Sequence, residues 1–153
     1  MLGAAALPPA AIAHGDSEHS SQADPSHGSM TNEHEHEHGA IDIPANQPVP
    51  TVQLIAHPDA KQGWNLEVQV TNFRFAPEHV NQASTPTEGH AHLYVDGQKI
   101  TRLYGNWYYL SSLTPGAHEI TVSLNANGHE TLMYQGEPLQ ASTRVEVPEP
   151  LGR

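Results

Sequence analysis

The stretch Gly89-His90-Ala91-His92-Leu93-Tyr94-Val95-Asp96-Gly97 decides the fold class of this chain. Every second residue from Ala91 to Val95 is apolar, and this period of two is typical of a β-strand that buries one face. Asp96-Gly97 is a sequence favoured in two-residue hairpin turns, because both residue types tolerate positive φ angles. The stretch therefore predicts a strand and a tight turn, followed by a returning strand that includes residues 100–103.

Similar alternations recur along the chain, with turn residues about every ten positions. Pro77 marks the segment before it as a strand end or an edge strand, and no segment has a helical period of useful length. The other expected strands are residues 52–55, 64–70, 73–75, 107–110, 118–124, 132–134 and 141–147. The residues expected to face the core are Leu66, Val68, Leu93, Val95, Ile120, Val122 and Leu124. The pattern predicts an all-β protein, an antiparallel Greek-key sandwich of the immunoglobulin or cupredoxin type.

Composition changes sharply near residue 50. Residues 14–50 hold six of the 12 histidines and seven of the 17 acidic residues, but no Lys, Arg or aromatic residue. Such a segment buries too little apolar surface to offset the entropy of ordering it. We therefore predict a disordered histidine- and acid-rich tail with a proline-rich linker over residues 14–50, a sandwich domain over residues 51–148 and a C-terminal tail over residues 149–153.

Residues 1–13 are apolar and end in Ala11-Ile12-Ala13, the small–x–small pattern that signal peptidases cleave. No basic residue precedes this run, and Pro8-Pro9 interrupt it, so we interpret it as the remnant of a signal peptide. No other stretch is long enough to span a bilayer. We expect an exported, periplasmic protein; the alternative is an apolar leader on a cytoplasmic protein.

The charge balance and the absence of cysteine exclude several functions. A net charge of −11 with only six Lys and Arg provides no basic patch for nucleic acid and is repelled by anionic membrane surfaces. The lack of Cys excludes disulfides, thiolate zinc sites, thiolate nucleophiles and the sulfur ligand of blue-copper sites. No serine elbow or phosphate-binding glycine loop is present, so we do not expect an enzyme.

His90 and His92 are the sharpest local signal for a binding site. Residues two apart in a strand point to the same face, so both imidazoles project together. The pair can share one metal ion, or flank a site that a neighbouring strand completes. The alternative is that both are exposed polar residues at the entry to a strand.

Two nitrogens are too few to select a metal, so a third donor is expected from elsewhere in the chain. His129, in the loop Asn127-Gly128-His129-Glu130, is the first choice, because its loop has no evident packing role. His118 and Met133 follow in that order. Their alternative interpretations are a core-edge histidine hydrogen-bonded to a turn and an ordinary core residue, respectively.

The run Glu33-His34-Glu35-His36-Glu37-His38 alternates imidazole with carboxylate. Such a run suits loose capture of Cu(II), Ni(II) or Zn(II) by His34, His36 and His38. If cleavage follows Ala13, the amine and ring of a new N-terminal His14 form a second kind of chelate, which some periplasmic copper proteins and copper monooxygenases use.

Several runs carry a family resemblance. They are Phe73-Arg74-Phe75-Ala76-Pro77-Glu78, residues 89–97, residues 102–110, Pro115-Gly116-Ala117-His118-Glu119-Ile120 and residues 124–129. They resemble a family of small exported bacterial β-sandwich proteins that carry a GHxHLYVDG motif. The resemblance covers about half of the chain and implies a cupredoxin-like fold and metal handling. His90, His92 and His129 match the family's histidines, whereas some members carry His where this chain has Tyr109.

The sequence thus supports three functions. The first is a periplasmic protein that binds a transition metal, copper first with zinc or nickel as alternatives, and buffers or delivers it to a metalloprotein or transporter. The second is a structural or interaction domain that binds no metal and whose histidines are incidental. The third, least favoured, is a copper oxidase or monooxygenase built on His14.

Overall fold

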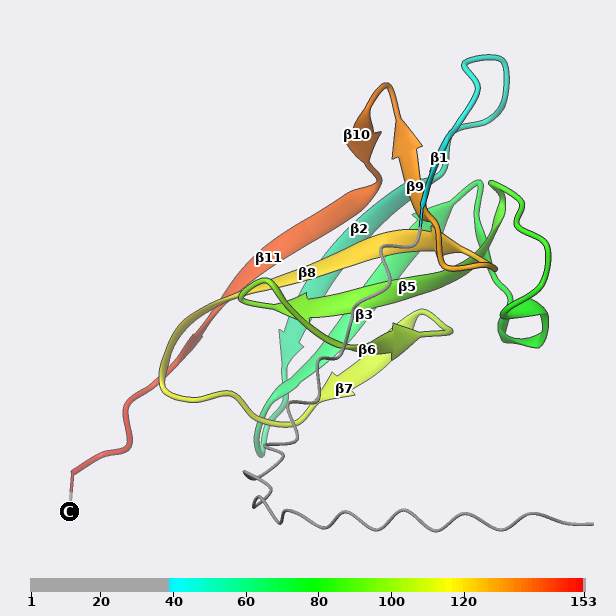
Figure 1. The fold of residues 1–153 in the computed structure, drawn as a ribbon. Coiled ribbons are helices and arrows are strands. Elements are labelled where there is room, and N and C mark those ends of the chain that lie inside the picture. The colour runs from blue at the N-terminus through cyan, green and yellow to red at the C-terminus, as the bar shows by residue number, and fades with distance from the viewer. Residues whose placement is uncertain (1–38, 153) are drawn as a thin grey trace, which may run out of the picture. The chain divides into compact units, whose positions relative to one another are not determined.

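A computed structural model describes residues 39–152 of the chain, and these residues form two β-sheets packed face to face (Figure 1). The larger sheet contains β1 (Ala40–Asp42), β4 (Arg74–Phe75), β5 (Glu88–Val95), β6 (Gln98–Leu103), β8 (Gly116–Ala126), β9 (Thr131–Tyr134), β10 (Glu137–Pro138) and β11 (Gln140–Val147). The smaller sheet contains β2 (Thr51–Pro58), β3 (Trp64–Thr71) and β7 (Trp107–Leu110). The predicted all-β sandwich is confirmed. The expected leader and the tail histidines His14, His34, His36 and His38 lie outside the described residues.

The only helical element within residues 39–152 is the 3-10 helix η1 (Pro77–His79). This part of the chain contains no helix long and apolar enough to cross a membrane. Most strand pairs are antiparallel, as expected, but β1 with β9 and β4 with β5 are parallel.

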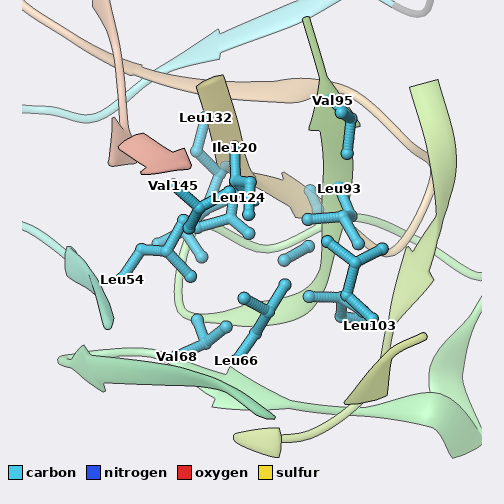
Figure 2. Packing of buried hydrophobic residues seen from close by; sticks show 14 of the residues in the cluster. Leu54, Leu66, Val68, Leu93, Val95, Leu103, Ile120, Leu124, Leu132 and Val145 are labelled. Atoms are coloured by element: carbon cyan, nitrogen blue, oxygen red, sulfur yellow. The ribbon is translucent and has the colours of Figure 1, made fainter. Parts of the chain in front are cut away.

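The core lies between the two sheets. Leu66 and Val68 of β3 face Leu93 of β5 and Leu124 of β8 across the sandwich (Figure 2). All seven residues that were expected to face the core are buried. Burial of these aliphatic side chains is the main stabilising term of such a fold.

The turn between β5 and β6 has the expected geometry. Asp96 has a φ of 50° and Gly97 a φ of 80°, the two positive angles of a hairpin turn that matches strand twist. The Asp96 carboxylate also accepts a hydrogen bond from the Glu119 backbone NH at 2.9 Å, which ties the turn to β8. The hairpin turn predicted at Asp96-Gly97 is therefore confirmed at that position.

The start of the domain differs from the predicted boundary at residue 51. β1 pairs with β9, with Ala40 opposite Thr131, and Ile43 is buried in the core at 3% exposure. Pro50 is also fully buried. The prediction was wrong for residues 40–50 because a few apolar residues, placed against a distant strand, are enough to hold a short segment in the sheet.

β5 occupies a central position in the larger sheet. Along one edge it pairs with β8, from Gly89 opposite Ala126 to Val95 opposite Ile120. Along its other edge it pairs first with β4 and then with β6. Both edges of the strand that carries His90 and His92 are therefore hydrogen-bonded, which holds the two residues in a fixed backbone.

Candidate metal centre

β5 carries core residues on one face and histidines on the other. Ala91 and Leu93 point into the sandwich, while His90 and His92 point away from it. Both histidines are nonetheless buried, with exposures of 1% and 3%. The interpretation as exposed residues at a strand entry is therefore wrong, because other parts of the chain cover this outer face.

His129 is part of that cover. It lies in the turn between β8 and β9, with its backbone NH donating to the Ala126 carbonyl at 2.9 Å and its carbonyl accepting from Asn125 Nδ2 at 3.1 Å. Its φ of 79° is in the left-handed region, which is costly for a residue with a Cβ. The surrounding hydrogen bonds hold His129 there, and its exposure is only 7%.

The nitrogens of the three rings converge. His90 Nε2 lies 3.0 Å from His92 Nε2 and 3.0 Å from His129 Nδ1. One ligand atom from each of the three residues lies within 4.8 Å of the other two. Residues from one strand and from a turn 37 positions beyond His92 thus form a single group of three nitrogen donors, which we call the histidine triad.

Asn81 sets the orientation of the His129 ring. The Nε2 of His129 donates to the Oδ1 of Asn81 at 2.6 Å. In a neutral ring the proton then sits on Nε2, so the lone pair is on Nδ1, which faces His90 Nε2 at 3.0 Å. Metal-binding histidines usually donate their outer nitrogen to a fixed acceptor in this way.

Burial keeps the His92 ring in the neutral form. The pKa of His92 is lowered to about 3, first by desolvation, then by the nearby charge of Lys99 and by the two other histidines. Arg102, directly opposite His92 on β6, acts in the same direction. At neutral pH the His92 ring therefore carries a lone pair, which is the state that binds a metal.

The loop that carries His129 is fastened to the segment before β5. The Ser84 hydroxyl donates to Glu130 Oε2 at 2.6 Å and accepts from the Gly128 NH at 2.8 Å. Asn127 Nδ2 donates to Glu88 Oε1 at 3.0 Å. The loop was expected to lack a packing role, and these contacts correct that view: its packing is what brings His129 to β5.

Glu88 is the ionic anchor of this region. Its carboxylate accepts hydrogen bonds from Asn127, from His79 at 2.6 Å and from Arg74 at 2.6 Å. These bonds, with that from Asn127 the strongest influence, lower the pKa of Glu88 to about 2. Glu88 is therefore ionised throughout the neutral range and positions the two loops without belonging to the triad.

Of the two reserve donors, His118 is engaged elsewhere, whereas the role of Met133 as a ligand stays a prediction. His118 is bonded through Nδ1 to Asp96 Oδ2 at 2.6 Å and through Nε2 to the Thr114 carbonyl at 2.8 Å, so its ring nitrogens are engaged at a turn. Met133 lies in β9, where it pairs with Asp42 and Pro138. The role of His118 as a ligand of this group is thus corrected in favour of the alternative interpretation.

Two further residues, His57 and Tyr109, also lie outside the triad. His57 pairs with Glu67 at 2.8 Å, and its ring lies 5.6 Å from that of Trp107. Tyr109, where some members of the resembled family carry His, is an exposed residue of the smaller sheet and donates to the Gln62 carbonyl at 2.7 Å. Tyr109 is therefore not an equivalent of a triad ligand.

Sequence reasoning missed Asn81 and Tyr104. The ring of Tyr104 lies 5.6 Å from that of His90 and helps to cover it. Neither residue has a local pattern that marks it, because Asn81 is separated from His129 by 48 positions and Tyr104 follows the end of β6. Only the folded arrangement reveals them.

Comparison with family models, with curated proteins and with solved structures gave no match to this chain.

Proposed function

We propose that this protein binds one transition-metal ion at the histidine triad, with copper as the first choice, and buffers or delivers that ion in the periplasm. The observation that carries the proposal is the convergence of three buried ring nitrogens within 4.8 Å of one another. Export rests on the apolar segment at residues 1–13 and its Ala11-Ile12-Ala13 ending.

The spacing of the nitrogens supports an ion at the centre of the triad. Imidazole nitrogens bind such ions at about 2.0–2.1 Å, which separates two tetrahedral ligands by roughly 3.3 Å. The separations of 3.0 Å from His90 to His92 and to His129 need only a small outward movement. A proton on His90 Nε2 can form a hydrogen bond to only one of the two neighbouring nitrogens at a time. A cation, in contrast, accepts a lone pair from all three rings.

The donor set favours copper and suits delivery. Among divalent first-row ions, copper has the highest affinity for a given nitrogen site, while zinc and nickel also accept imidazole. Three protein ligands leave a further coordination position, where a donor from a receiving metalloprotein or transporter can enter before the triad releases the ion.

The second candidate function is a structural or interaction sandwich that binds no metal. The observation in its favour is that the three rings and Asn81 already contact one another through hydrogen bonds of 2.6–3.0 Å. On this view the triad is a buried polar network that fastens the His129 loop to β5.

One titration separates the two functions. The full chain, purified without a nickel resin, is titrated with Cu(II) against a competing chelator, next to the variants His90→Gln/His92→Gln and His57→Gln/His118→Gln. We expect the tightest one-equivalent site to be lost in the first variant and kept in the second, which removes two histidines outside the triad. If the first variant, folded by circular dichroism, keeps that site, the metal function is wrong.

A further inference from the structure

The ligands of the histidine triad bring no negative charge to an ion. Histidine binds a metal as a neutral imidazole. Within residues 39–152 the triad is the only converging group of three or more histidine or acidic side chains, and no carboxylate belongs to it. The acidic residues beside it in sequence are bonded elsewhere, since Glu88 accepts from Asn127 and Arg74, and Glu130 accepts from Ser84. The full charge of a bound ion therefore stays in the site.

Two positively charged side chains lie on the same face of the sheet as the triad. Arg102 of β6 is directly opposite His92, and Lys99 is opposite Tyr94, the next residue on that face of β5. Directly opposed residues have Cβ atoms about 4.5–5.5 Å apart, and diagonal neighbours about 7–8 Å. Arg102 also donates from Nη1 to the Oη of Tyr104 at 3.5 Å, and the Tyr104 ring helps to cover the triad. Both positive charges thus border the position of the ion.

Such a border discriminates between ions by their charge. Repulsion from a fixed positive charge is twice as large for a doubly charged ion as for a singly charged one, and the cost of desolvating an ion rises more steeply still. The three rings are buried, with exposures of 1%, 3% and 7%, so water screens these effects only partly. Neutral ligands beside a positive border therefore favour Cu(I) over Cu(II), Zn(II) and Ni(II).

The number of ligands favours the same form of copper. Imidazole binds copper in both oxidation states, so the donor type alone does not select one. Cu(II) prefers a tetragonal site, whereas Cu(I), like Zn(II), is a d10 ion with no geometric preference from its d electrons and accepts three ligands. The triad supplies three nitrogens, two pairs of which are 3.0 Å apart, and no other histidine or acidic side chain of residues 39–152 joins them. Ligand number thus separates Cu(I) from Cu(II), and charge separates it from Zn(II).

We infer that the triad holds copper as Cu(I), and that Lys99 and Arg102 set this preference by disfavouring divalent ions. The inference rests on the proposed function and names the form of the ion that is buffered or delivered. A receiving protein then needs donors suited to Cu(I), which are thioethers and thiolates. Such a donor enters as the fourth ligand, before the triad releases the ion.

The test measures the affinities of the full chain for Cu(I) and Cu(II) in separate chelator competitions, the first of them without oxygen. His90→Gln/His92→Gln removes two ligands. All variants share residues 1–38, so the affinity lost between wild type and this variant reports the triad alone. We expect this loss to be at least about tenfold larger for Cu(I) than for Cu(II).

A second variant tests the positive border. Lys99→Gln/Arg102→Gln should lower the ratio of the Cu(I) affinity to the Cu(II) affinity about tenfold at low salt, because the divalent ion gains more from removal of the two charges. Lys61→Gln/Arg144→Gln is the matched control. It removes the same charge from the turn between β2 and β3 and from β11, where Arg144 is opposite Glu119, and it should keep the wild-type ratio.

The outcomes distinguish this inference from the proposed function. If His90→Gln/His92→Gln loses as much affinity for Cu(II) as for Cu(I), or more, the triad binds metal but the preference for Cu(I) is wrong. If Lys99→Gln/Arg102→Gln changes the ratio no more than the matched control does, the positive border does not set it, and the inference is overturned. If His90→Gln/His92→Gln is folded by circular dichroism and keeps the wild-type affinity for both ions, the proposed function falls as well.

Discussion

The Nε2 of His129 donates to the Oδ1 of Asn81 at 2.6 Å, and both residues hold left-handed backbone angles, with φ of 79° and 65°. Two loops that are distant in sequence are thus each bent into an uncommon conformation where they meet. Conformations of this kind persist only when their surroundings enforce them, and they cluster at functional sites. The pair fixes the direction in which His129 Nδ1 presents its lone pair.

Replacing Asn81 with Ala should weaken metal binding more than it weakens the fold. Without the Oδ1 acceptor the His129 ring can rotate or change its tautomer, and loss of such an outer partner typically lowers metal affinity about 10- to 100-fold. Asn72→Ala is the matched control, since Asn72 also has a positive φ (53°) but donates to the Val49 carbonyl. Chelator competition measures both variants; equal affinities would show that Asn81 does not orient the ligand.

Replacing Gly89 with Ala should destabilise the protein. An added Cβ would lie 2.0 Å from the Asn125 carbonyl oxygen, so β5 and β8 would have to separate next to His90. Overpacking in a close-packed region costs about 1–3 kcal/mol. Gly105→Ala is the control, because a Cβ there meets no atom within 4 Å. Chemical denaturation would contradict this reasoning if the two variants had the same free energy of unfolding.

Replacing Ile43 with Ala tests whether the domain begins before residue 51. Ile43 is buried in the core at 3% exposure, and truncation of such a side chain costs about 2–5 kcal/mol. Ile100, which is 46% exposed, is the control and should change stability little when it is truncated in the same way. An Ile43→Ala protein as stable as the control would place β1 outside the cooperative unit.

The pair His118–Asp96 should make stability depend on pH. Hydrogen bonds to Asp96 and then to the Thr114 carbonyl raise the pKa of His118. Bonds from His118 and then from the Glu119 NH lower the pKa of Asp96. The contribution of His118 is therefore complete below its ordinary value of 6.5 and is lost as pH rises through its raised folded value. That of Asp96 is present above 3.8 and is lost as pH falls through its lowered folded value.

The pair thus acts at full strength between about pH 4 and 6.5. Thermal unfolding with a chelator present should show a larger difference in Tm between wild type and Asp96→Asn at about pH 5.5 than at about pH 9. Asparagine keeps the tolerance for a positive φ at this turn, so the comparison isolates the charge. A difference that stays constant, or grows, toward high pH would contradict the assignment.

Much of the fold could be predicted because its signals are local. Alternation located the strand that contains Leu93 and Val95, and Asp96-Gly97 located its turn. β1 could not be found in this way, because three residues are too few for a period and their partner, β9, lies about 90 positions away. The apolar Ile41 and Ile43 were a weak signal inside a polar region.

The candidate site was only half predictable for the same reason. His90 and His92 could be placed on one face because residues two apart in a strand point to the same side. The approach of His129 depends on its loop being fastened through Ser84 and Asn127, and no sequence pattern reports such contacts. The burial of the pair was unexpected, because it is caused by segments other than β5.

Because residues on both faces of β5 are buried, the register of β5 against β8 decides whether the chain has folded correctly. A slip of one residue against β8 would turn His90 and His92 into the apolar core and expel Ala91 and Leu93 from it. The Asp96 carboxylate at the end of β5 opposes such a slip, because it accepts from the Glu119 NH of β8 and pairs with His118 of the same strand. A misaligned chain would lose its stability and its group of three nitrogen donors together, so on the proposed function only correctly assembled molecules would bind the ion.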